Sequence, residues 1–194
     1  MNEKDLVVDR DAQLMLGLQK GDEQCFDQLF EKYKRPVANF AYRFTGRRDI
    51  AEELAQDILV KCYLGADTYQ PNSKLSTWIF RIARNHCLNE VRRQDYRYRS
   101  VPLPEYGDEQ PASMNSPEEE VEAAELKRTV GAVLAALPEK QRMALLLSRQ
   151  QSMSYEEIAQ ALGTSISAVK SLLNRAKNTL LERLGKLAEE NYDL

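Results

Sequence analysis

The sequence has few of the residues that most often bind metals or carry out catalysis. It contains one histidine, His86, and three widely separated cysteines, Cys25, Cys62 and Cys87, so no pair has metal-ligand spacing. It also lacks a phosphate-binding loop and a nucleophile–base pair. We therefore expect no catalytic residue, no metal and no cofactor. The cysteines are interpreted as buried or half-buried thiols in a reducing compartment.

Long apolar runs are also missing. No stretch approaches the roughly 20 apolar residues that a membrane-spanning helix needs, and the charged start Met1–Arg10 lacks the apolar core of a secretion signal. We expect a cytoplasmic protein with no direct membrane insertion. The β-branched alternation typical of strands is absent too, and this absence favours an all-α fold.

Charge is unevenly distributed along the 194 residues, although the net charge is only −3. Ala66–Ser100 has seven basic and three acidic residues, and Leu126–Leu194 has ten basic and seven acidic ones. Between them, Val101–Glu125 has eight acidic residues and no basic one. The weak net charge therefore does not exclude nucleic-acid binding by the two basic segments.

The acidic segment also marks the boundary between two predicted domains. Val101–Pro117 contains four prolines and few large apolar residues, so we expect an extended or flexible linker. Ser116, Pro117 and the acids Glu118–Glu120 form a helix-start pattern. We predict two small helical domains, at residues 1–99 and 118–194, joined by a flexible acidic linker at residues 100–117.

Apolar spacing of three and four predicts the helices of both domains. Asp49 is expected to cap one of them, and Gly46 to end another that contains Pro36. A loop is predicted at Tyr69–Lys74. The predicted helices are Ala12–Gln19, Glu23–Phe44, Ile50–Tyr63, Ser76–Arg93, Leu126–Leu137 and Glu139–Arg149.

The segment Ser154–Leu184 has the pattern of a helix-turn-helix that reads duplex DNA. Ser154 and Glu157 form a capping box, Gly163 ends the first short helix, and Ser165 or Ser167 can cap the second. The alternative is a helical hairpin with a solvated basic face. Residues that could contact base edges or phosphates are Ser167, Lys170, Ser171, Asn174, Arg175 and Lys177.

A second block, Ser76–Arg93, combines aromatic residues with a polar helix face that suits single-stranded DNA. The alternative interpretation is that Trp78 and Phe80 are core residues and that the arginines are solvated. For Trp78 we favour core packing; composition alone does not decide the arginine row. The polar face consists of Arg81, Arg84, Asn85, Asn89, Arg92 and Arg93.

With these blocks in this order, the sequence closely resembles the group IV (extracytoplasmic function) sigma factors of bacterial RNA polymerase, over almost the whole chain. The resemblance implies a sigma2-like helical bundle followed by a sigma4-like helix-turn-helix domain. It rests on Gly21–Tyr33, Asp49–Lys61, Thr77–Asn85, Leu137–Arg142, Tyr155–Ala159 and Val169–Ser171.

The resemblance also implies a role for each group of residues. The helix-turn-helix would read the −35 element of promoter DNA, and core RNA polymerase would be contacted at the β′ clamp and the β flap. A cognate anti-sigma factor, in this family often membrane-bound, is the further partner implied. The clamp would bind Asp49, Glu52, Glu53, Leu54, Gln56 and Asp57, while Tyr69, Asn72, Ser73 and Lys74 would join the Arg81–Arg93 face in melting and holding the −10 element.

Two residues depart from the family pattern. Leu59 stands where an aromatic residue is common, and we interpret it as a core substitution. Leu172 stands where the DNA-reading helix often has arginine, which predicts fewer phosphate contacts. The main alternative function is a stand-alone helix-turn-helix regulator that binds operators as a dimer, under which the block around Trp78 has no role.

Overall fold

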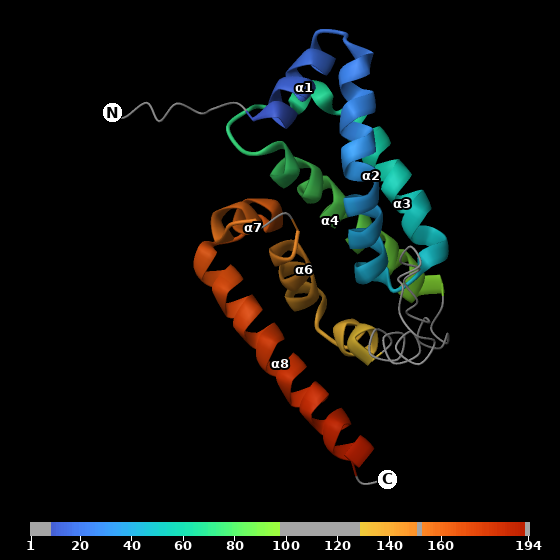
Figure 1. Cartoon of the computed structure of the whole chain (residues 1–194), viewed down its shortest axis with the longest axis vertical. Helices are drawn as coiled ribbons and strands as arrows, with labels where there is room; N and C mark the ends of the chain where they lie inside the picture. The colour runs from blue at the N-terminus through green and yellow to red at the C-terminus, as the bar shows by residue number, and fades with distance from the viewer. Residues whose placement is uncertain (1–8, 98–128, 151–152, 193–194) are drawn as a thin grey trace, which may run out of the picture.

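Helices form all the regular secondary structure in the part of the chain that the computed structural model describes, residues 9–97, 129–150 and 153–192. The predicted all-α fold is therefore confirmed for these ranges. Figure 1 shows two groups of helices, one from each half of the chain, lying against each other. The linker at residues 100–117, the predicted helix start at Ser116 and the first residues of the helix predicted at Leu126–Leu137 lie outside the described residues.

The first group of helices follows the predicted pattern to within a few residues. Gly21 (φ 91°) and Gly46 (φ 73°) adopt the left-handed conformation where the first two helices end, and this conformation favours glycine. Pro36 lies inside the second helix, which continues to Thr45. The elements are α1 (Arg10–Gln19), α2 (Glu23–Thr45), α3 (Arg48–Leu64), the short 3₁₀ helix η1 (Ala66–Thr68) and α4 (Leu75–Arg97).

The predicted cap of α3 was wrong. The helix begins at Arg48, so Asp49 lies within its first turn rather than before it, and the preceding Arg47 makes no side-chain capping bond. Asp49 instead accepts hydrogen bonds from the Arg47 guanidinium, which lowers the pKa of the carboxyl. A carboxylate in the first turn is also favoured by the positive end of the helix dipole, so either position suits an aspartate.

A buried polar cluster joins α1 to α2. The Asp11 carboxylate lies 2.6 Å from the Lys32 ammonium and accepts a hydrogen bond of 2.6 Å from the Tyr33 hydroxyl. Burial, and then the acidic partner, raise the pKa of Tyr33 well above its ordinary value. The hydroxyl therefore remains a donor throughout the physiological range and ties the first helix to the second.

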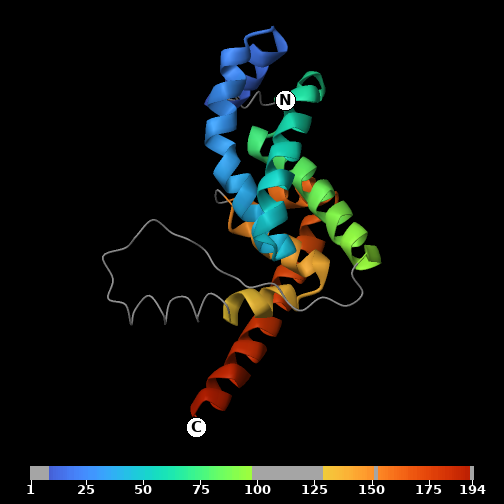
Figure 2. The same cartoon turned by 90° about the vertical axis from the view of Figure 1, so that its right-hand side faces the viewer.

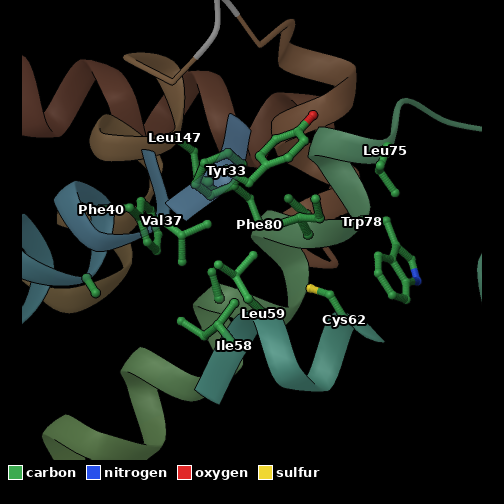
Figure 3. Packing of buried hydrophobic residues seen from close by; sticks show 14 of the residues in the cluster. Tyr33, Val37, Phe40, Ile58, Leu59, Cys62, Leu75, Trp78, Phe80 and Leu147 are labelled. Carbon is green, nitrogen blue, oxygen red and sulfur yellow. The ribbon is translucent and has the colours of Figure 1, made fainter. Parts of the chain in front are cut away.

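Aromatic rings from α2 and α4 form the centre of the core (Figure 3). Phe40 and Phe80 are fully buried and meet edge to face, with ring centroids 5.3 Å apart. Trp78 is 6% exposed, which confirms its predicted place in the core, and Leu59 is buried as expected. These aromatic side chains are therefore packing residues in this arrangement and do not stack on an external ligand.

The second half of the chain contains the predicted helix-turn-helix. The capping box is confirmed: the Ser154 amide donates to Glu157 Oε2 over 2.7 Å, and the Glu157 amide donates to Ser154 Oγ over 3.2 Å. Gly163 is left-handed, and Ser165 rather than Ser167 caps the last helix by accepting from the Ala168 amide. The elements are a helix at residues 129–135, α6 (Glu139–Ser148), α7 (Tyr155–Leu162) and α8 (Ile166–Tyr192).

The two groups of helices share one continuous core. α7 packs against α4 and α6 against α2, whereas the far end of α8 extends away from the rest (Figures 1 and 2). Leu147 of α6 belongs to the same buried cluster as Tyr33 and Phe80 (Figure 3), and the Arg142 guanidinium lies 4.8 Å from the centre of the Phe44 ring. The two groups of helices are therefore in direct apolar contact.

Candidate nucleic-acid interface

The start of α8 presents a continuous polar face. Ser165 ends the turn after Gly163 and sets where the helix begins, so residues spaced by three and four share one side. The opposite side carries Val169 and Ala176, which are fully buried. The predicted duplex-reading residues all lie on the exposed side: Ser167, Lys170, Ser171, Asn174, Arg175 and Lys177.

One exposed aromatic residue extends this face and was missed in the sequence. Tyr155, the first residue of α7, is 45% exposed, and the Lys170 ammonium lies 5.8 Å from the centre of its ring. An aromatic residue directly after a capping serine, outside the apolar stripe of its helix, was the available signal. The two residues form a cationic and aromatic corner between α7 and α8.

The loop between η1 and α4 is held in shape from both sides. The Gln19 side-chain amide of α1 donates to the carbonyls of Ala66 and Tyr69, over 2.8 and 2.9 Å. Tyr69 is only 2% exposed, packs edge-on against Trp78 and donates its hydroxyl to the Ser73 carbonyl over 3.1 Å. Tyr69 therefore shapes the loop from inside, which corrects its prediction as a residue that itself holds the −10 element.

The other predicted single-strand residues do not form one surface. Asn72, Ser73 and Arg81 line a groove of about 460 Å³ that Gln160 of α7 closes from the other side. Arg84 and Arg92 line a second groove, of about 250 Å³, opposite the turn of the helix-turn-helix. Asn85, Asn89 and Arg93 are exposed, and the last two face α3 instead. The set is therefore divided between two sides of α4.

The predicted polymerase-binding face of α3 is mostly exposed. Its charged and polar members are open to solvent, but Leu54 is only 7% exposed and belongs to the core, so its assignment as a contact residue is corrected. Glu53 and Asp57 line a groove of about 280 Å³ together with His86 and Arg93 of α4. The exposed members are Asp49, Glu52, Glu53, Gln56 and Asp57.

The three cysteines are free thiols that lie inside the protein or at the edge of its core. Cys62 and Cys87 are buried, and burial raises the pKa of each thiol to about 12. Cys25 is half-buried, and its thiol donates to Asp22 over 3.3 Å. The prediction of buried or half-buried thiols is confirmed.

Within the described ranges, no helix is both long and apolar enough to span a bilayer.

Comparison with known proteins identifies the family. Sigma-70 region 2 matches residues 29–97, and Sigma-70, region 4 matches residues 127–180. The RNA polymerase sigma-H factor of Pseudomonas aeruginosa is 30% identical over 191 residues, covering 95% of this chain and 99% of that relative. The ECF RNA polymerase sigma-E factor of Escherichia coli K12 is 30% identical over 176 residues, covering 88% and 92%. The chain belongs to the extracytoplasmic function sigma factors.

A solved structure agrees with this family. The sigma factor is similar to the sigma factor RpoE from Bartonella quintana, solved in complex with the anti-sigma factor NepR, with a TM-score of 0.67 and 28% identity over 82% of this chain and 96% of that one. The family resemblance seen in the sequence is confirmed. The protein is an alternative sigma factor that directs promoter-specific transcription, and a stand-alone dimeric regulator is not favoured.

Proposed function

We propose that this sigma factor divides promoter recognition between two domains, residues 1–99 and 118–194, joined by the acidic linker at residues 100–117. The observation that carries the proposal is the exposed face of α8, on which all the predicted duplex-reading side chains gather. An α-helix fits the major groove of B-form DNA, where arginine and lysine pair with guanine and asparagine pairs with adenine. This face would read the −35 element. It would do so without catalytic groups of its own, since the protein acts as a DNA-binding initiation factor and not as an enzyme.

The first domain is proposed to open and hold the −10 element. Asn72, Ser73 and Lys74 lie in a loop that Gln19 and Tyr69 keep in one conformation, and Arg81 follows on the same side of α4. Moving a base out of the stack costs a few kcal/mol, and a preformed site can recover this cost selectively. Arg84 and Arg92 would neutralise the phosphates of the exposed strand, and the Asn85 amide would donate a hydrogen bond to it.

The loop geometry leads to a first prediction. Replacing Gln19 by alanine removes both donors that hold the Ala66 and Tyr69 carbonyls, so the loop should order less well and binding of single-stranded DNA should weaken by roughly 2- to 5-fold. Fluorescence anisotropy with a labelled 12-nucleotide single-stranded pool of mixed sequence measures the change. The exposed Gln24 replaced by alanine is the control. Unaltered binding by the Gln19 variant would show that the hydrogen bonds from Gln19 to the loop do not contribute to binding of single-stranded DNA.

Core RNA polymerase is the proposed partner of α3, on whose exposed side Glu52, Glu53 and Asp57 are solvent-accessible carboxylates. Polymerase works in the cytoplasm, and we propose that this protein does too.

A cognate anti-sigma factor is a further proposed partner, since the Bartonella quintana relative was solved with one. The exposed apolar side chains of Val60 and Leu64, at the end of α3, offer it a contact surface.

Reconstituted transcription tests the proposal as a whole. Purified sigma factor is mixed with core RNA polymerase from a related bacterium and a library of genomic promoter fragments, and the transcripts are sequenced. We expect discrete start sites that require the sigma factor. DNA binding in the absence of polymerase, combined with no effect on transcript start sites, would contradict the proposal and support a stand-alone regulator.

A charge reversal tests the polymerase contact separately. Glu53→Lys places a positive charge on the proposed docking face and should weaken binding to core polymerase by roughly 3- to 10-fold, chiefly through slower association. Surface plasmon resonance against immobilised core polymerase measures both rates. Asp27→Lys makes the same change in charge at an exposed position of α2 and is expected to leave both rates unaltered. Equal effects of the two variants would move the docking site away from α3.

A further inference from the structure

The groove of about 250 Å³ between α4 and the turn of the helix-turn-helix is lined by several cations. Three basic side chains reach it from two elements, Arg84 and Arg92 from α4 and Lys140 from α6. Among the lining residues, Glu139 carries the single carboxylate, and it lies in the first turn of α6, where the helix dipole favours an acid. Three cations and one anion give the lining a net charge of +2. The groove therefore favours an anion.

These cations are available to a further partner. Among the side chains that the structure describes, none forms an ion pair with Arg84, Arg92 or Lys140. The Arg84 guanidinium donates a long hydrogen bond of 3.4 Å to the Asn85 side chain, which is neutral. Arg92 and Lys140 are exposed to solvent. An anion in the groove would thus gain partners without breaking an ion pair among the described residues.

The rest of the lining is largely apolar. Met143 is only 1% exposed, and Leu88, Leu162 and Leu172 are half-buried, so part of each leucine side chain remains accessible. Leu172 stands where related reading helices often have arginine. An arginine there would replace an apolar wall by a fourth cation. The combination of cations with an apolar lining is therefore a property of this chain.

We propose that this groove binds a small amphiphilic anion, a molecule with a phosphate-like head and an apolar body. The head would lie among the three cations, which form strong charge-assisted hydrogen bonds with such groups. The body would lie against Met143 and the leucines, as in other ligand pockets that are mostly apolar with a few convergent polar groups. A cavity of about 150 Å³ holds benzene, so this groove has room for roughly eight to ten carbons.

Such a ligand would compete with promoter DNA for part of its binding surface. This step rests on the proposed function, in which Arg84 and Arg92 neutralise the phosphates of the melted strand. A head group that binds the same two arginines leaves fewer cations for that strand. The exposed reading face of α8, which includes Asn174 and Arg175, does not line the groove. Duplex binding should therefore be unaffected by the ligand.

Titration calorimetry with octyl phosphate and the full chain tests the site without DNA. We expect one site per chain and binding at least about tenfold tighter than that of butyl phosphate, since each buried methylene adds roughly a factor of four. Octanol lacks the head and inorganic phosphate lacks the body, so each should bind at least about tenfold more weakly than octyl phosphate. Equal binding of octyl and inorganic phosphate would indicate an adventitious ion only and would overturn the proposal.

Vesicles of phosphatidylglycerol present the same chemistry at a membrane surface. We expect no cosedimentation of the protein with them, because the groove is bounded by residues of four helices and takes a single free molecule. Cosedimentation combined with no binding of octyl phosphate would overturn the free ligand and indicate a lipid within a membrane.

Two variants locate the ligand in this groove. Lys140→Glu reverses one of its charges and Leu172→Ser removes an apolar wall, so each should weaken octyl phosphate binding at least about fivefold. The matched controls are Lys20→Glu and Leu181→Ser, the same changes at exposed positions elsewhere, and both should bind normally. Circular dichroism checks that all four variants fold. Unaltered binding by the folded groove variants would show that the ligand binds elsewhere and would overturn the site.

Fluorescence anisotropy tests the competition. Saturating octyl phosphate should weaken binding of a labelled 12-nucleotide single-stranded pool at least about threefold and leave binding of a 20-base-pair duplex pool unaltered. Unaltered single-strand binding with the ligand bound would overturn the competition. Absence of single-strand binding without any ligand would instead contradict the strand-holding role of the first domain, and the titrations would still support or overturn the ligand site by themselves.

Discussion

Replacing Phe80 by alanine is expected to lower the free energy of unfolding by about 3–5 kcal/mol, the usual cost of deleting a fully buried aromatic side chain. The ring of Phe80 is 0% exposed and meets Phe40 edge to face across the contact between α2 and α4. Leu147 of α6 belongs to the same buried cluster (Figure 3), so the cavity would open in the core that both groups of helices share. Urea unfolding followed by circular dichroism measures the change.

The same variant separates the two interpretations of this residue. If Phe80 stacked on bases, its loss would weaken single-strand binding with little effect on stability. Because it is buried, we expect the stability loss to dominate. Leu64→Ala, at a position that is 74% exposed, is the control and should alter stability by no more than about 0.5 kcal/mol. A loss below about 1 kcal/mol for Phe80→Ala would contradict its place in the core.

Replacing Arg175 by alanine should weaken promoter binding by about 1–3 kcal/mol, or roughly 5- to 150-fold, if its guanidinium pairs with a guanine edge. Arg175 is exposed on the reading face of α8, beside Asn174 and one turn beyond Ser171. The loss should be concentrated at one position of the −35 element, because a base contact discriminates between sequences and a phosphate contact does not. The measurement is holoenzyme binding to duplexes with single −35 substitutions.

Arg183 offers a matched control. It is an exposed arginine of the same helix, about 12 Å further along at 1.5 Å per residue, and beyond the proposed reading face. Arg183→Ala loses the same charge and should reduce binding by less than about 2-fold. If Arg175→Ala weakens all −35 variants equally, Arg175 contacts a phosphate; if it weakens none, the assignment of this face fails.

Local chemistry made much of the second domain predictable. The capping box of Ser154 and Glu157, the left-handed Gly163 and the spacing of Val169 and Ala176 are properties of short segments, and each appears in the structure as expected. The same holds for the glycines that end α1 and α2. Such features are set by residues within four positions of one another, so they need no knowledge of distant parts of the chain.

Errors occurred where a side chain's surroundings depend on a different element. Leu54 and Tyr69 were expected to contact partners, but α4 packs over the first, and Trp78 covers the second. Gln19 was missed for the same reason: its partners Ala66 and Tyr69 are 47 and 50 residues away. The contact between α4 and α7 also could not be predicted from the sequence pattern. An apolar stripe indicates that a helix face is buried, but it does not name the helix that covers it.

The single core that joins the two domains bears on how such a protein can be altered by recombination. A chimera that takes its second domain from another sigma factor would place different side chains against Phe44 and Leu88. Its residues at positions 142 and 162 would differ, while the residues of α2 and α4 that face them would not have changed to fit. The proposed DNA-reading face of α8 could be exchanged with little consequence for the core, since its side chains are exposed and their contacts, such as that of Lys170 with the Tyr155 ring, lie at the surface. If this face reads the −35 element as proposed, promoter preference can change by exchange of a few exposed residues, whereas α6 and α7 must change together with α2 and α4.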